Sequence, residues 1–350
     1  MSENITREDS LRLNPIIDPA AWTPIEVEKD ENWVYRFSDK EINELLDAAS
    51  KLVSRNVDLI HVEKGDFVLP YTASTFLDIY NELKKGRGFV QMRGLPVGEI
   101  SRKQTAALFW GVGTYFGTAL SQNPEGHFLG HVKDLGKDYN QPAVRGYQTK
   151  AAMTFHSDPC DMVALLCLQP AKLGGESRVA SSITLYNEML KRRPELVADL
   201  CKDFYWTKHG EHSSDDKPWY KLPVFNFKEG KFSGKGASTH ARKAQDLPGA
   251  EPWDALRNEA VNLFQEMVSQ LAADLPFQEG DLQILNSHVT LHSRRPYEDW
   301  EDPSQKRHLY RLWLENEDLR PVPDVVRNNL KGVIMEGFTP CTPLDAEEAA

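Results

Sequence analysis

The spacing of apolar residues predicts helices in the first third of the chain. A Ser-Asp-Lys-Glu capping box at residues 38–41 precedes apolar residues at helical spacing up to Val53. Further helices are expected over residues 75–85, which end at the Gly86-Arg87-Gly88 turn, and over residues 101–116. Residues 1–37 are polar and contain several prolines, so we expect an N-terminal arm laid over a domain.

Strand patterns dominate the rest of the chain. The run at residues 162–168 is continuously apolar, which suits a strand buried on both faces, and residues 282–292 form one long extended run. Further strands are expected at residues 89–94 and 306–314, a Gly-Gly turn between two strands at 172–181, and a hairpin at 225–232. Helices are expected at residues 182–204, interrupted at Pro194, and at 253–271. This order predicts an α+β, mainly β fold. Residues 38–315 form its single domain, and the acidic, proline-rich residues 316–350 form a surface tail.

Charge and composition narrow the class of protein. The chain has 41 Lys and Arg against 52 Asp and Glu, a net charge of −11, which argues against binding to nucleic acid or to an anionic membrane. No window approaches ~18 uninterrupted apolar residues, as a transmembrane helix requires. The four cysteines form no Cys-x-x-Cys pair, so a reducing, cytoplasmic location is expected.

A His-x-Asp pair in the middle of the chain offers two metal ligands. His156 and Asp158 point to the same face of an extended strand, so both can reach one ion. A second histidine from a distant segment would complete a 2-His-1-carboxylate triad, which suits Fe(II) and leaves open coordination positions. The run at 282–292 supplies His288 and His292, which share a face of a regular strand, so spacing alone does not choose between them.

Other polar residues are candidates for ligand binding. A competing pair, His209 and Glu211, is disfavoured because no apolar strand follows it. Arg307 and Arg311 share one face of the last predicted strand, where they can hold an anion despite the negative net charge. The loop-rich segment 117–154 contains four residues that could line a pocket, namely Gln122, Asn123, His127 and His131. The competing interpretation is that they are ordinary polar loop residues.

Four linked motifs carry a resemblance to a known family. They are the His-Ser-Asp at 156–158, the Gly-Gly-Glu-Ser turn at 174–177, and the segments 286–292 and 307–314. In this order they resemble the taurine dioxygenase-like family of Fe(II)- and 2-oxoglutarate-dependent oxygenases. The resemblance implies a double-stranded β-helix, a cupin-like jelly roll with flanking helices. One departure is a longer, acidic gap between the last two motifs.

The resemblance also implies roles for particular residues. The metal ligands would be His156, Asp158 and His292, which leaves His288 to line the pocket or to donate a supporting hydrogen bond. Arg307 falls at the position that grips the far carboxylate of 2-oxoglutarate. Two further positions match cosubstrate-binding residues of the family, namely Ser177 for the same carboxylate and Arg311 for the cosubstrate or for an anionic group of the substrate.

The implied activity is oxidation of an unactivated C–H bond with Fe(II), O₂ and 2-oxoglutarate, which is converted to succinate and CO₂. Hydroxylation is the default outcome, and relatives also desaturate or cyclise their substrates. The expected substrate is a small molecule with a carboxylate or sulfonate, such as an amino acid. Association into a homo-oligomer is left open.

Two other classes of protein compete with this interpretation. A non-catalytic jelly-roll binding protein would use the histidines and aspartate structurally, and a Zn²⁺-dependent hydrolase would use them around a metal-bound water. The hydrolase is disfavoured because no general base stands near the motif as in His-Glu-x-x-His. For Arg307 the alternative is an ion pair with a nearby acid, namely Glu298, Asp299, Glu301 or Asp302.

Overall fold

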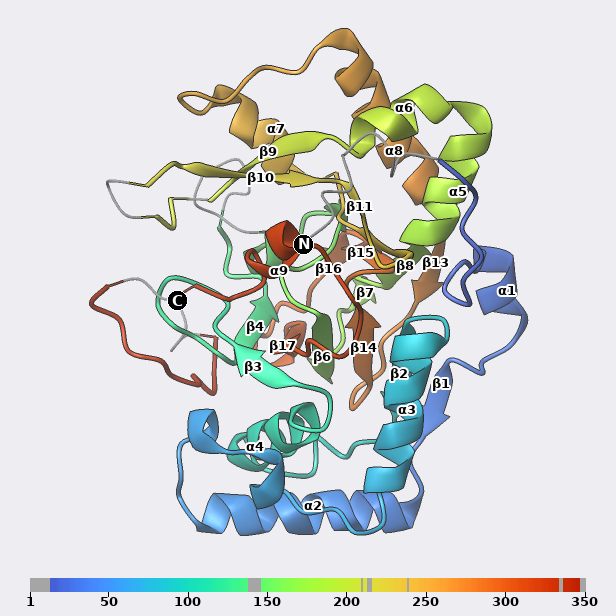
Figure 1. The fold of residues 1–350 in the computed structure, drawn as a ribbon. Helices are drawn as coiled ribbons and strands as arrows, with labels where there is room; N and C mark the ends of the chain where they lie inside the picture. Colours follow the sequence, from blue (N-terminus) through green and yellow to red (C-terminus); the bar gives the residue numbers. More distant parts are fainter. Residues whose placement is uncertain are drawn as a thin grey trace, which may run out of the picture.

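The computed structural model describes residues 13–137, 146–208, 210–212, 216–237, 239–333 and 336–346, and two facing β-sheets form its centre (Figure 1). The larger sheet has the order β1 (Val34–Arg36), β2 (Phe89–Arg93), β14 (Leu282–Asn286), β6 (Met162–Gln169), β17 (His308–Glu315) and β3 (Thr118–Leu120), with β4 (Gly130–Lys133) also paired to β17. The smaller sheet has the order β13 (Ala272–Leu275), β8 (Ser177–Ser181), β15 (Thr290–Arg294) and β5 (Met153–His156).

Three two-stranded ribbons lie outside these sheets. They pair β9 (Asp203–Thr207) with β10 (Trp219–Pro223), β11 (Phe225–Lys228) with β12 (Lys231–Gly234), and β7 (Leu173–Gly174) with β16 (Tyr297–Glu298). Pairing within both sheets is antiparallel except between β1 and β2. The result is the jelly-roll arrangement expected from the sequence.

Strand β6 shows why its sequence is apolar without interruption. Its odd-numbered residues 163–167 belong to the apolar cluster between the two sheets. Its even-numbered residues 162–168 belong to a second cluster beneath the helices on the outer face of the larger sheet. Because both faces of the strand are covered, alternation with polar residues is absent, and the prediction of a doubly buried strand is confirmed.

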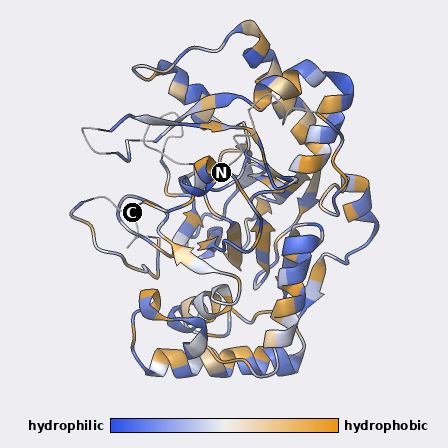
Figure 2. Cartoon of the chain, viewed as in Figure 1, coloured by the Kyte–Doolittle hydropathy of each residue, from blue (hydrophilic) through white to orange (hydrophobic). Residues whose placement is uncertain are grey.

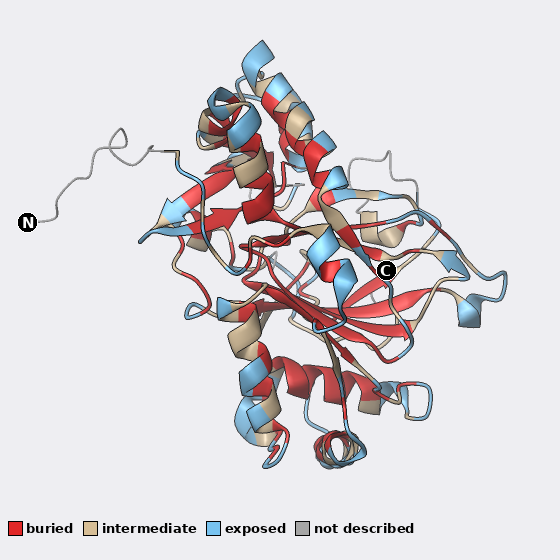
Figure 3. Cartoon of the chain, turned by 90° about the vertical axis from the view of Figure 1, so that its right-hand side faces the viewer, coloured by how far each residue is buried: buried red, intermediate tan, exposed pale blue. Residues whose placement is uncertain are grey.

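Helices cover the outer face of each sheet, which gives four layers. Helices α2 (Asp39–Ser54), α3 (Ala73–Lys85) and α4 (Arg102–Gly113) pack on the larger sheet, and α5 (Ser182–Arg192), α6 (Pro194–Leu200) and α8 (Ala255–Gln270) pack on the smaller one. Figure 3 shows the buried strands between these two groups of helices. The remaining helices are α1 (Pro24–Lys29), α7 (Thr239–Lys243) and α9 (Asp324–Arg327). Within the described ranges, no helix combines the length and apolarity needed to cross a bilayer.

The predicted helix boundaries are close to those observed. Ser38 accepts a hydrogen bond from the backbone N–H of Glu41, whose side chain accepts from the backbone N–H of Ser38, so the capping box begins α2 as expected. Apolar and polar residues alternate around α2 in Figure 2, with the apolar stripe in the cluster against the sheet. The break at Pro194 separates α5 from α6.

The prediction of one continuous strand over residues 282–292 is wrong. The chain leaves the larger sheet after β14, turns at residues 287–289, and enters the smaller sheet as β15. The side chain of Asn286 accepts a hydrogen bond from the backbone N–H of His288 at 3.0 Å, which stabilises the turn. His288 and His292 therefore lie on different elements, and the argument that they share a strand face does not hold.

Both ends of the described chain are more embedded than the sequence suggested. In the N-terminal arm, β1 pairs with β2, and the backbone oxygens of Ala20 and Trp22 accept hydrogen bonds from buried side chains at the start of α5. In the C-terminal segment, Val322, Val326 and Leu330 are buried in the cluster beneath the smaller sheet. These residues pack into the domain and do not lie on its surface as a tail would.

Candidate metal centre and substrate cavity

Three predicted ligands meet at one end of the smaller sheet. His156 ends β5 and stands opposite His292 of β15, and Asp158 follows two residues after β5. Nε2 of His156 is 3.9 Å from Oδ1 of Asp158, and Nε2 of His292 is 3.8 Å from Oδ2. One potential ligand atom from each residue lies within 4.8 Å of the others, and no other trio of His, Cys, Asp or Glu in the described ranges is grouped in this way.

The protonation states of His292 and Asp158 favour a metal ion. Burial lowers the pKa of His292 to about 3, so its imidazole is neutral at working pH. Burial acts to raise the pKa of Asp158, but Arg311 and the two histidines outweigh it and hold the pKa below its usual range. His156 donates from Nδ1 to the carbonyl oxygen of Thr154 at 2.9 Å, which turns Nε2 toward Asp158. Oδ2 of Asp158 is buried and has no hydrogen-bond partner among the described residues, as expected of an oxygen that binds a cation.

Arg307 lies in a small cavity beside the trio. The cavity measures about 50 Å³, and both histidines, Asp158, Ser177 and Arg307 line it. The guanidinium of Arg307 donates to the carbonyl oxygen of Gly175 at 3.3 Å, and its Nη1 is buried with no hydrogen-bond partner among the described residues. Burial lowers the pKa of Arg307 from its ordinary value.

Nearby acids do not neutralise this arginine. Asp299 accepts a hydrogen bond from the backbone N–H of Arg307 at 2.7 Å, and no carboxylate within the described ranges lies within 4.0 Å of the guanidinium. The Gly-Gly turn makes room for it, since Gly175 has φ +76° and a Cβ there would stand 3.1 Å from Nε of Arg307. Ser177 donates to Oε1 of Gln283 at 2.9 Å beside the same cavity.

Arg311 lies between the small cavity and a larger one. Its Nε donates to Oε1 of Gln122 at 2.7 Å, and its Nη1 lies 3.7 Å from Oδ2 of Asp158. The rings of Tyr147 and Trp313 each lie 4.8 Å from the guanidinium carbon. Gln122 is thus used to orient Arg311, and it does not line the larger cavity.

The other loop candidates lie away from the metal trio. Asn123 and His127 contact each other at 3.0 Å and line a minor cavity of about 20 Å³. His131 is buried against His308, with Nδ1 of His131 2.8 Å from Nε2 of His308. The competing His209 lies outside the described residues.

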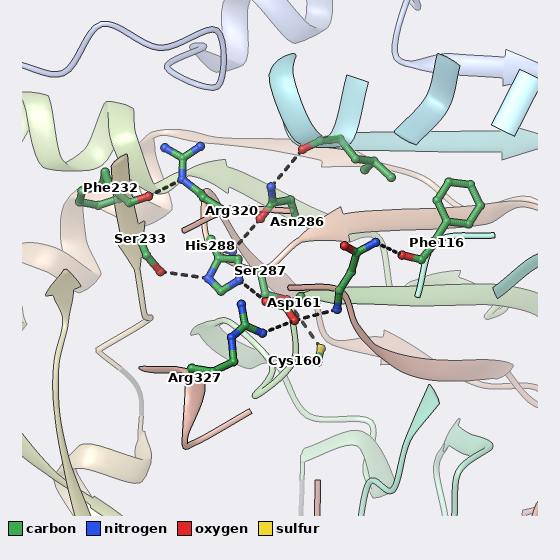
Figure 4. A network of polar contacts seen from close by, with 12 residues as sticks. Phe116, Cys160, Asp161, Phe232, Ser233, Asn286, Ser287, His288, Arg320 and Arg327 are labelled. Atoms are coloured by element: carbon green, nitrogen blue, oxygen red, sulfur yellow. Dashed lines mark hydrogen bonds and ion pairs between the residues drawn. The ribbon is translucent and has the colours of Figure 1, made fainter. Parts of the chain in front are cut away.

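His288 belongs to a separate polar network (Figure 4). Its Nε2 lies 2.7 Å from Oδ1 of Asp161, and its Nδ1 lies 3.0 Å from the hydroxyl of Ser233. Asp161 also accepts from Arg327 at 2.6 Å and from the backbone N–H of Asn316 at 2.8 Å. His288 lines none of the cavities described above, so the structure does not bring it to the metal trio as a pocket residue.

The larger cavity opens in front of the metal trio. It measures about 310 Å³, within the range of pockets that hold small organic ligands. His156, Asp158 and Arg311 line it, together with two further segments that we call its outer wall, namely residues 235, 236, 239, 240 and 243 and residues 328, 329 and 331–333. Sequence patterns missed these outer segments because isolated lysines and asparagines in polar stretches resemble ordinary surface; only the folded chain brings them together.

Comparisons with known proteins agree with this geometry. A family model described as taurine catabolism dioxygenase TauD, TfdA family matches residues 54–313. FR-33289 synthase of Streptomyces rubellomurinus (strain ATCC 31215) is 29% identical over 320 residues, which cover 88% of this chain and 93% of the synthase.

Solved structures share the fold at low sequence identity. Asparagine oxygenase in complex with Fe(II), 2S,3S-3-hydroxyasparagine and succinate has a TM-score of 0.64 and 16% identity, covering 87% of this chain and 99% of its own. The non-heme iron oxygenase OrfP in complex with Fe and alpha-ketoglutaric acid has a TM-score of 0.59 and 13% identity, covering 86% and 99%. The chain belongs to the TauD, TfdA family and is a dioxygenase that uses Fe(II), 2-oxoglutarate and O₂.

Proposed function

We propose that His156, Asp158 and His292 hold the Fe(II) ion, and that Arg307 with Ser177 binds the far carboxylate of 2-oxoglutarate. The observation that carries this proposal is the buried guanidinium of Arg307, which has an unpartnered nitrogen and no acidic partner in the described ranges, in a cavity shared with the trio. A carboxylate that enters this cavity supplies the missing partner, and the planar fork of arginine suits it.

The protein's own residues position the reactants. When bound, the metal supplies the redox chemistry that consumes O₂ and 2-oxoglutarate. His156, oriented by the carbonyl of Thr154, and Asp158, near Arg311, would hold the metal together with His292. The aromatic rings of Tyr147 and Trp313 lie on the guanidinium of Arg311 and hold it at the junction of the two cavities.

The substrate is a small molecule bound in the larger cavity. Similar folds have been solved with 2S,3S-3-hydroxyasparagine bound to asparagine oxygenase and with (3S)-hydroxy-L-Arg bound to OrfP, and both of these ligands are hydroxylated amino acids. We therefore propose hydroxylation of an amino acid or a related small anion. Arg311, at the junction of the cavities, is available to an anionic group on either side.

Turnover of 2-oxoglutarate tests this function. Purified protein supplied with Fe(II) and O₂ should release succinate, and a panel of amino acids and small sulfonates should include compounds that stimulate the release. Zn²⁺, Ni²⁺ or Cu²⁺ should inhibit, since two imidazoles and one carboxylate bind Ni²⁺ and Cu²⁺ at least as tightly as Fe²⁺. Full turnover after exhaustive chelation, with no metal restored, would refute the proposal.

Two further predictions concern the setting of the protein. We propose a cytoplasmic location, because the cysteines within the described ranges are all free thiols and burial raises the pKa of Cys160 and Cys167. Fractionation of cells that express the protein checks this. Self-association stays a prediction for light scattering to check.

A further inference from the structure

The outer wall of the larger cavity is positively charged although the chain carries a net charge of −11. Three lysines from separate segments line it, namely Lys235, Lys243 and Lys331. Within the described ranges, none of the three has a carboxylate within 4.0 Å. The other charged groups on this wall are Lys208, which is paired with Asp216, and Glu211.

The backbone at Lys235 is fixed beside strand β5, and its side chain extends over an aromatic ring. Its ammonium lies 4.9 Å from the centre of the Trp206 ring, and its backbone N–H donates to the carbonyl of Val224 at 2.7 Å. The next residue, Gly236, packs on strand β5 so closely that a Cβ at this position would stand 2.5 Å from Cα of His156. The lysine therefore sits on a wall that the fold fixes relative to the metal site.

The other two lysines also lie on anchored segments. Helix α7 ends at Lys243 and contacts strand β5, because the hydroxyls of Thr239 and Thr154 lie 3.2 Å apart. Lys331 follows helix α9. Arg327 at the end of this helix donates a hydrogen bond to Asp161 at 2.6 Å, which anchors the helix to the network of Figure 4. Three cations that have no carboxylate within 4.0 Å in the described ranges thus line one cavity.

Such an arrangement is unfavourable unless an anion occupies it. Like charges around a partly enclosed cavity repel each other, and a cavity of one sign concentrates ligands of the opposite sign. Arg311 also lines the cavity, but it already contacts Gln122 and lies near Asp158. Lys208 is paired with Asp216. The outer lysines are therefore the cations most available to a group at the mouth of the cavity.

We propose that the prime substrate carries an oxyanion at the end remote from the carbon that is oxidised, and that Lys235, Lys243 and Lys331 bind it. This inference rests on the proposed function, because the inner end of the cavity is defined by the metal trio. The shared chemistry is that of a carboxylate, sulfonate or phosphonate on a chain long enough to extend from the metal site to the outer wall. A compact substrate would leave the lysines unused.

Unbranched alkanesulfonates are suitable probes because the sulfonate stays charged at all working pH values. Butane- and hexanesulfonate, with the alcohols of equal length as neutral controls, are titrated by calorimetry into anaerobic protein loaded with Fe(II) and 2-oxoglutarate. The sulfonates should bind at least tenfold more tightly than the alcohols. Lys235→Gln and Lys243→Gln should each weaken sulfonate binding about tenfold, as expected for the loss of one charge-assisted hydrogen bond.

Lys221→Gln is the matched control. Lys221 also stacks on an aromatic ring, 4.5 Å from the centre of Tyr205, but it does not line the cavity, and its loss changes the net charge by the same amount. The control should leave sulfonate binding unchanged, and Lys235→Arg should restore it. Sulfonates that bind no more tightly than the alcohols, or equal weakening by Lys221→Gln, would overturn the inference.

A titration of 2-oxoglutarate in the same samples separates two kinds of failure. Protein that binds 2-oxoglutarate but shows no preference for sulfonates refutes only the lysine site. Protein that binds neither refutes the proposed function.

Discussion

Two histidine–aspartate pairs connect the same two segments of the chain, yet they differ in how many of their polar atoms have hydrogen-bond partners. His292 and Asp158 are separated by 3.8 Å, and Oδ2 of Asp158 is buried without a hydrogen-bond partner. His288 and Asp161 are separated by 2.7 Å, and Asp161 also binds Arg327 and the backbone of Asn316.

The difference shows which pair suits a metal ion. Buried polar groups are normally hydrogen-bonded, so an unsatisfied carboxylate oxygen that faces a cavity indicates a missing partner. The pair at Asp161 has all its partners within the chain, and there the pKa of Asp161 is held low, against the effect of burial, by hydrogen bonds from His288 and Arg327. The same residue types thus form a candidate metal-ligand site at Asp158 and a structural hydrogen-bond network at Asp161.

The largest expected contrast comes from the two histidines. His292→Ala should weaken Fe(II) binding more than 100-fold, because even residues that only orient a ligand contribute about 10- to 100-fold. His288→Ala should retain Fe(II) binding and lower the melting temperature instead. Anaerobic iron titration measures both; normal binding by His292→Ala with loss in His288→Ala would reverse the assignment.

Arg307 offers the next contrast. Arg307→Ala should raise the dissociation constant for 2-oxoglutarate by about 100-fold or more, since breaking a buried ion pair costs about 3–5 kcal/mol. Arg307→Lys should restore binding only in part, because an ammonium lacks the bidentate fork. Arg295→Ala is the control, as Arg295 is exposed and paired with Asp274 at 2.7 Å. Anaerobic calorimetry that gave wild-type affinity for Arg307→Ala would move the anchor, with Arg311 as the next candidate.

Disruption of the satisfied pair should affect stability more than metal binding. Asp161→Asn removes the charge that holds Arg327 and His288, and should lower the free energy of unfolding by about 2 kcal/mol. Urea unfolding measures this, and iron titration of the same variant should match wild type. A variant of unchanged stability that fails to bind iron would assign Asp161 to the metal site.

The last expected effect is a pH dependence of folding stability, which arises away from the metal site. Burial lowers the pKa of His131 to about 4 and that of His308 to about 2, whereas an unfolded histidine titrates near 6.5. Below pH 6.5 the unfolded chain therefore binds protons that the folded chain does not, and stability falls as pH decreases, down to pH 4 for His131 and pH 2 for His308. Each histidine contributes a slope of up to about 1.4 kcal/mol per pH unit.

His308→Gln should flatten this dependence between pH 6 and 4.5. Urea unfolding at several pH values checks it. An unchanged slope would mean that His308 is already protonated in the folded protein.

Local patterns in the sequence predicted the helices and strands well, because capping boxes, glycine turns and apolar periodicity act within a few residues. The doubly buried β6 and the capped α2 are examples. The turn at residues 287–289 was missed because its cause, the passage of the chain from one sheet to the other, is set by tertiary structure and by a side-chain hydrogen bond of Asn286.

The candidate site was predictable in part. His156 and Asp158 were found from residue types and spacing, whereas His292 and Arg307 were assigned through the resemblance to a family, and all four line one cavity. The role of Gln122 depends on its contact with Arg311, more than 70 positions away in the chain. The lysines of the outer wall lie in segments without periodicity, and only the fold brings them to one cavity. No local pattern carries such information.

The most direct test of the metal assignment is the position of the ion itself. Crystals grown anaerobically with Fe(II) would show it as an anomalous difference peak at the iron absorption edge. We predict one peak between His156, Asp158 and His292, beside the oxygen of Asp158 that has no hydrogen-bond partner. A peak at the His288–Asp161 pair, with none at the trio, would contradict it.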